Sequence, residues 1–120
     1  MDGMKTVIHV SHDVPYSRAE FFTTLESFSE NKIEVIKVCR ATQEIWTKHV
    51  YIRFLTRHSN FCGLSVDELF GIRNYFNEIY LKDRTKPRFS GSIADYVKKI
   101  EENATNDAFL KQELDKIRKE

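Results

Sequence analysis

Residues 47–54 read TKHVYIRF, and apolar and polar side chains alternate along this stretch. Alternation with a period of two is typical of a half-buried β-strand, because successive side chains point to opposite faces of a sheet. The core face of such a strand would hold the three apolar side chains Val50, Ile52 and Phe54. The other face would carry His49, Tyr51 and Arg53. The stretch therefore predicts a strand over 46–55 whose second face is available for function.

The composition sets the class of protein. The chain has 120 residues, which suits one domain with a core of its own, and its net charge of +1 indicates no global positive field for nucleic acid. Cys39 and Cys62 lack a CxxC spacing, so we expect free thiols in the cytoplasm or nucleus. No apolar run approaches the ~18 residues of a membrane span, so we expect no membrane partner.

Apolar periodicity predicts alternating strands and helices along the rest of the chain. We expect these elements in order: a strand at 6–10, a helix at 18–29, strands at 33–39 and 46–55, a helix at 69–76 and a strand at 85–89. Capping boxes at 17–20 and 65–68 indicate the two helix starts. From residue 92 a charged sequence predicts helix, either one or two, with a second apolar stripe formed by Leu110, Leu114 and Ile117.

The order β-α-β-β-α-β is that of an α+β, ferredoxin-like sandwich, in which two helices cover one face of a four-stranded antiparallel sheet. We expect this domain at 5–89 and a C-terminal helical extension at 92–119.

Over residues 5–89 the chain resembles the RNA-recognition motif (RRM) family. The family's octamer, Lys/Arg-Gly-Phe/Tyr-Gly/Ala-Phe-Val-x-Phe/Tyr, aligns in register with TKHVYIRF, and the last four positions match well. The family's hexamer on the first strand aligns with residues 8–12, where His9 takes the aromatic position. Residues 77–84, NEIYLKDR, are similar to the segment before the family's last strand, without its two glycines.

The resemblance implies a nucleic-acid site on the open sheet face, where bases stack on aromatic rings. Carried over by position, the site comprises His9, His49 and Tyr51 as rings, with Lys48 and Arg53 near phosphates. Two of the three rings are imidazoles, which offer smaller stacking surfaces than Phe or Tyr. The resemblance therefore implies weak or auxiliary binding of single-stranded RNA.

The chain has more aromatic residues than one small core can hold, which indicates an interface. The interface residues we predict are Trp46, Phe61, Tyr75, Ile93, Val97 and Ile100. The last three form an apolar helix stripe that docks either on the open sheet or on another chain. We therefore expect a divergent RRM that acts as a protein–protein interaction module, by dimerisation or as a scaffold, in an RNA-processing ribonucleoprotein complex. Its partner would be another subunit or a second copy. The alternative is an RRM that binds single-stranded RNA through its sheet face.

An enzyme is the minor alternative. Residues 96–99, YVKK, resemble the Tyr-x-x-Lys motif of replication-initiator endonucleases, in which Tyr96 would be the nucleophile. His49 would begin the paired-histidine metal motif, but its second position is Tyr51. We therefore expect no enzymatic activity, no metal and no cofactor.

Overall fold

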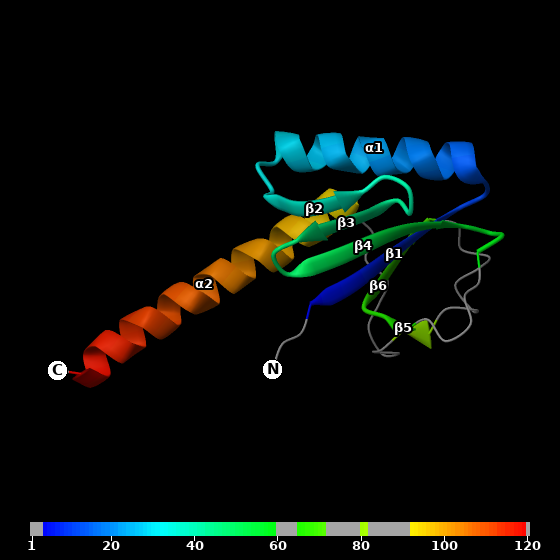
Figure 1. Ribbon diagram of the computed structural model, residues 1–120. Helices are drawn as coiled ribbons and strands as arrows, with labels where there is room; N and C mark the ends of the chain where they lie inside the picture. The colour runs from blue at the N-terminus through cyan, green and yellow to red at the C-terminus, as the bar shows by residue number, and fades with distance from the viewer. Residues whose placement is uncertain (1–3, 60–64, 72–79, 82–91, 120) are drawn as a thin grey trace.

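A mixed β-sheet lies at the centre of the computed structural model, which describes residues 4–59, 65–71, 80–81 and 92–119 (Figure 1). The elements in chain order are β1 (Lys5–Ser11), α1 (Val14–Glu30), β2 (Val35–Cys39), β3 (Glu44–Thr47), β4 (Val50–Thr56), β5 (Ser65–Val66), β6 (Glu68–Gly71), β7 (Tyr80–Leu81) and α2 (Ile93–Lys119).

The strand order of the main sheet is β2-β3-β4-β1-β6. β1 is parallel to both of its neighbours, β4 and β6, whereas β2, β3 and β4 form an antiparallel meander. β5 and β7 pair separately as a parallel ladder. The fold is α+β, but the predicted four-stranded antiparallel ferredoxin-like sheet is wrong, because the sheet has five strands and is partly parallel.

The first cause of this error lies in TKHVYIRF itself, which is a hairpin and not one strand. Thr47 ends β3 and Val50 begins β4, so Lys48 and His49 form the turn between them. Trp46 then lies opposite Tyr51. The predicted core side chains of β4 are confirmed, since Val50, Ile52 and Phe54 are all buried.

The second cause lies at residues 65–71, where we expected a helix start and the chain forms strands. Asp67 does not cap a helix. Its Oδ2 accepts a hydrogen bond from the Thr6 amide at 2.8 Å, and its own amide donates to the Thr6 carbonyl at 2.9 Å. This pair of hydrogen bonds holds Asp67 beside Thr6, immediately before β6, which runs parallel to β1 from Val7 onward. The expected strand at 85–89 lies outside the described residues.

The predicted first helix is confirmed, but it begins four residues earlier than expected, at Val14. Asp13 is its N-cap and accepts from the Tyr16 amide, and Pro15 occupies the first turn, where its missing N–H costs nothing. Ser17, the expected cap, is instead fully buried inside the helix.

The core lies between the sheet and the helices α1 and α2. α1 covers one face of the sheet, and the first turns of α2 pack into the same apolar cluster (Figure 1). Phe21 and Phe28 come from α1, and Ile93 and Val97 come from α2. Residues 93–119 form one continuous helix, α2, and its C-terminal half projects away from the sheet (Figure 1).

Candidate functional site: interaction surfaces

The three rings of the predicted RNA platform do not share a face. His9 lies toward α1, with its ring 5.5 Å from that of Phe54 and its Nε2 3.9 Å from the Glu20 carboxylate. Its side chain is only 13% exposed. Burial lowers the pKa of His9, and the Glu20 charge offsets only part of that effect. His9 is therefore a partly packed core side chain.

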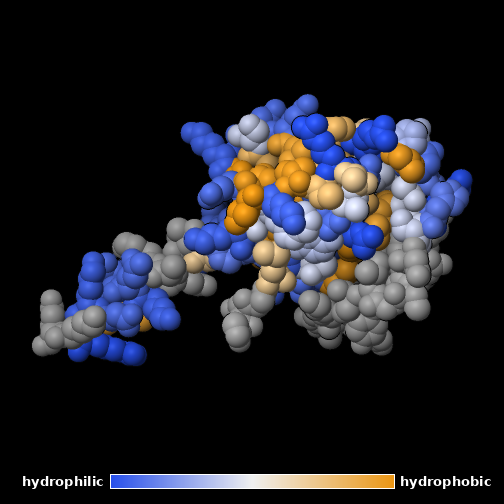
Figure 2. Space-filling view, viewed as in Figure 1, coloured by the Kyte–Doolittle hydropathy of each residue, from blue (hydrophilic) through white to orange (hydrophobic). Residues whose placement is uncertain are grey.

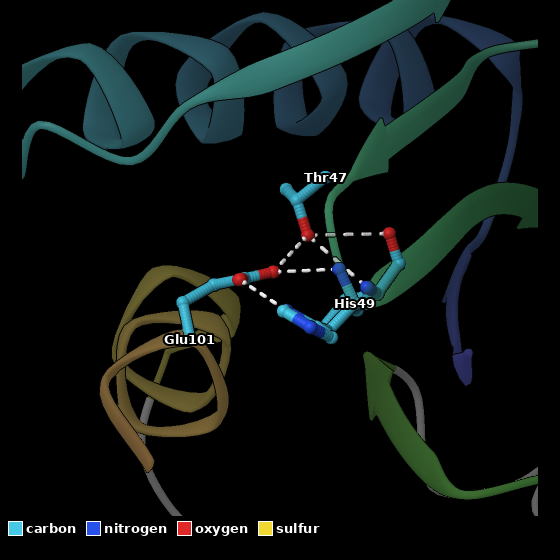
Figure 3. A network of polar contacts seen from close by, with 4 residues as sticks. Thr47, His49 and Glu101 are labelled. Atoms are coloured by element: carbon cyan, nitrogen blue, oxygen red, sulfur yellow. Dashed lines mark hydrogen bonds and ion pairs between the residues drawn. The ribbon is translucent and has the colours of Figure 1, made fainter. Parts of the chain in front are cut away.

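His49 lies in the β3–β4 turn and is held by Glu101 of α2 (Figure 3). Glu101 Oε1 accepts hydrogen bonds from Thr47 Oγ1 at 2.7 Å and from the His49 amide at 2.9 Å. Its Oε2 lies 2.7 Å from His49 Nδ1. A carboxylate only accepts, so Nδ1 carries the hydrogen in this arrangement. One glutamate thus satisfies the donors of a turn that lies 52 residues away in the chain.

Glu101 also has the electrostatics of a fixed anion. Burial alone would raise its pKa, but the hydrogen bonds from His49 and Thr47 outweigh burial and hold the pKa of Glu101 below its ordinary value. The Thr47 hydroxyl extends the network, because its Oγ1 accepts from the Val50 amide at 3.1 Å. α2 is therefore joined to the sheet by a polar clamp as well as by its apolar stripe.

Tyr51 takes part in a ladder of side chains across β2, β3 and β4. Its ring stacks on Trp46 with centroids 5.1 Å apart, and Lys37 Nζ lies 4.8 Å from the Trp46 ring centroid. The Tyr51 hydroxyl donates to Glu44 Oε2 at 2.5 Å. Burial, together with this hydrogen bond, raises the pKa of Tyr51 to about 12.

The ladder directs the aromatic faces at one another. Trp46 has Lys37 on one face and Tyr51 on the other, since the three residues come from consecutive strands. A base that stacks on a ring needs a free face, and the inner ring of this ladder has none. Arg53 lies opposite Glu44 next to the ladder, whereas Lys48 is exposed in the turn.

The predicted interface residues of α2 pack on their own chain. Ile93 and Val97 are buried in the core cluster, and Ile100 packs against it half-buried. Tyr96, the nucleophile of the endonuclease alternative, is 4% exposed, and burial raises its pKa. Trp46 belongs to the ladder. Phe61 and Tyr75 lie outside the described residues.

Two areas of exposed apolar side chains stand out among the residues that the structure describes. One is the stripe on the distal half of α2, where Leu110, Leu114 and Ile117 are 59%, 53% and 67% exposed. The sequence shows this stripe, but our predicted interface omitted it. The other is the hydrophobic surface gathered over β2 beside α1 in Figure 2; the exposed apolar side chains of these two elements include Phe22 of α1 and Ile36 and Val38 of β2. No local sequence pattern predicts this second area, because it forms only when β2 lies beside α1.

Comparisons of the chain with protein-family models, with curated proteins and with solved structures found no match. Within the described ranges, neither helix combines the length and the apolarity needed to cross a membrane. The assignment to cytoplasm or nucleus stays a prediction.

Proposed function

We propose that this chain is a protein–protein interaction module that self-associates through the distal half of α2. The apolar stripe of Leu110, Leu114 and Ile117 supports this function most directly. The stripe lies on the part of α2 that projects beyond the head, by which we mean the sheet, α1 and the first turns of α2 (Figure 1). Three large apolar side chains exposed on one helix face are unfavourable in water and favour a partner that covers them.

The spacing of the stripe fits a helical partner. Leu110, Leu114 and Ile117 recur at intervals of four and three, as the d, a and d positions of a heptad do. The buried Tyr96 and the half-buried Ile100 fall in the same heptad phase. The distal stripe therefore continues the side of α2 that packs on the head, and a second helix can lie along it.

The charges beside the stripe favour a second copy in parallel orientation. Glu113 precedes Leu114 at a g position, whereas Lys111 and Arg118 occupy e positions. A parallel pair sets Glu113 of one chain beside Arg118 of the second copy, and the symmetry gives two such pairs. An antiparallel pair would instead bring the basic e positions together, which is repulsive.

The expected affinity is low. Burying six side chains that are each more than half exposed in one chain gives about 6 to 10 kcal/mol. Association costs at least ~4 kcal/mol, which leaves at most about 2 to 6 kcal/mol and therefore a dissociation constant no tighter than roughly 40 μM. The clamp at Glu101 supports binding indirectly, because it holds α2 in one orientation before the partner arrives.

Sedimentation equilibrium of the full chain from about 10 μM to about 1 mM tests the proposal. We expect a monomer–dimer equilibrium that Leu114→Glu abolishes and Asn103→Leu strengthens, because residue 103 is the d position one heptad before Leu110. Glu113→Lys should weaken the dimer, and adding Arg118→Glu to it should restore the dimer. Asp115→Lys is the matched control, since it makes the same charge change at an exposed position outside the seam. A chain that stays monomeric throughout, also with Asn103→Leu, would contradict the proposal.

A further inference from the structure

A pocket of about 490 Å³ opens between α1 and the turn that joins β2 to β3. Its lining residues are Arg18, Phe21, Phe22, Arg40, Ala41 and Gln43. This volume lies within the roughly 300 to 1,000 Å³ of pockets that hold small organic ligands. The pocket is remote from the distal half of α2, so its use does not depend on self-association.

The walls of the pocket are held in place by contacts of their own. Gln43 Oε1 accepts a hydrogen bond from the buried Ser17 hydroxyl at 2.6 Å, and the Gln43 carbonyl accepts from the Phe54 amide at 3.0 Å. Gln43 has a φ of 55°, an unusual conformation for a residue other than glycine. The Phe21 ring is 1% exposed and packs edge-to-face on Phe54 at 5.6 Å and on Phe22 at 5.4 Å. The pocket is therefore formed before a ligand binds.

The charge around this apolar space has one sign. Arg18 stands on α1 and Arg40 on the turn after β2, so the two guanidinium groups come from different walls. Both side chains are exposed, and neither forms an ion pair within the part of the chain that the structure describes. No carboxylate is among the described residues that line the pocket. Two free guanidinium groups beside two phenylalanine rings complement a ligand that is both apolar and negatively charged.

We propose that this pocket binds a small amphipathic anion. Its apolar body lies against Phe21, Phe22 and Ala41, and its carboxylate, sulfonate or phosphate group is bound by Arg18 and Arg40.

Anilinonaphthalene sulfonate is a suitable probe, because it joins an aromatic body to one fixed negative charge. We expect saturable binding of one probe molecule per chain. The rise and blue shift of the probe's fluorescence measure this binding. Arg18→Ala combined with Arg40→Ala should weaken binding by about tenfold or more, since both charge-assisted hydrogen bonds are lost. Arg57→Ala, an exposed arginine elsewhere, should leave binding unchanged, and so should Leu114→Glu on α2. Circular dichroism verifies that every variant is folded.

Competition identifies the anion. Displacement of the probe by decanoate supports a carboxylate with an alkyl chain, and displacement by phenyl phosphate supports an aryl phosphate. N-phenyl-1-naphthylamine has a similar aromatic body without the charge and should bind at least about tenfold more weakly. Equal binding of the neutral probe, or sulfonate binding that survives loss of both arginines, would overturn the proposal. Displacement by an acidic peptide but by neither small anion would also overturn it, because the pocket would then belong to a protein interface.

Discussion

Replacing Glu101 with alanine removes the acceptor of three short contacts, from Thr47 Oγ1, the His49 amide and His49 Nδ1. A hydrogen bond to a charged group contributes about 1.5 to 3 kcal/mol when it is buried. The Glu101 side chain is 21% exposed, so water can replace part of what is lost. We therefore expect Glu101→Ala to lower the free energy of unfolding by about 2 to 4 kcal/mol, less than the sum of three buried bonds.

Urea unfolding at pH 7 measures this loss, and Glu102→Ala is the matched control because Glu102 is the neighbouring residue of the same helix and is exposed. The control should change stability by less than about 0.5 kcal/mol. If the two variants lose the same amount, the clamp does not stabilise the fold and our argument about α2 is wrong.

The same clamp predicts a pH dependence. The pKa of Glu101 is lower in the folded chain than its ordinary value of 4.5, so folding favours the ionised carboxylate. The stabilisation is fully present above pH 4.5 and disappears as the pH falls through the folded pKa. The difference in stability between the wild-type chain and Glu101→Gln should therefore shrink as the pH falls below about 4.5. A difference that grows as the pH falls below 4.5 would contradict the assigned direction.

Two further predictions concern the sheet. Tyr51→Phe should cost about 1.5 to 3 kcal/mol through loss of the hydrogen bond to Glu44. The loss should nearly vanish in a Glu44→Ala background, in a double-mutant cycle measured by the fluorescence of the single tryptophan, Trp46. Gly71→Ala should cost about 3 kcal/mol or more, because Gly71 has a φ of 101° and an added Cβ would lie 2.1 Å from the Val10 carbonyl oxygen. A thermal melt checks the second prediction, and a loss under about 1 kcal/mol would contradict it.

The hairpin at 47–54 shows why local pattern was insufficient for the fold. A two-residue hairpin usually carries Asn-Gly or a similar pair, because the favoured turns need positive φ angles. Among the described residues other than glycine only Lys32 and Gln43 have positive φ, so the turn at Lys48 and His49 is of another kind and lacks that signature. The His49 amide in this turn donates to Glu101, and the sequence of residues 47–54 alone cannot predict that partner.

The strand at Glu68–Gly71 has a similar explanation. The spacing of Ser65 and Glu68 satisfies a helix capping box. Asp67 between them instead hydrogen-bonds to Thr6: its carboxylate accepts from the Thr6 amide, and its own amide donates to the Thr6 carbonyl. Pairing with β1 buries Leu69 and Phe70 on a parallel ladder, and this burial outweighs a local helix preference worth only tenths of a kcal/mol per residue. Elements that depend on short-range signals alone, β1 and α1, were predicted close to their observed places.

The apolar stripes of α2 were visible in the sequence, but their roles were not, because only the position of the head decides which of them is covered. Ile93 and Val97 lie over the sheet and are buried, whereas Leu110, Leu114 and Ile117 lie beyond the head and stay exposed. A parallel pair of α2 helices would place both heads at the same end of the short seam. Each head would then hold its own pocket between α1 and the β2–β3 turn, since none of the described residues that line that pocket comes from α2. Self-association and anion binding should consequently be separable by mutation, with Leu114→Glu affecting the first and the paired arginine substitutions affecting the second.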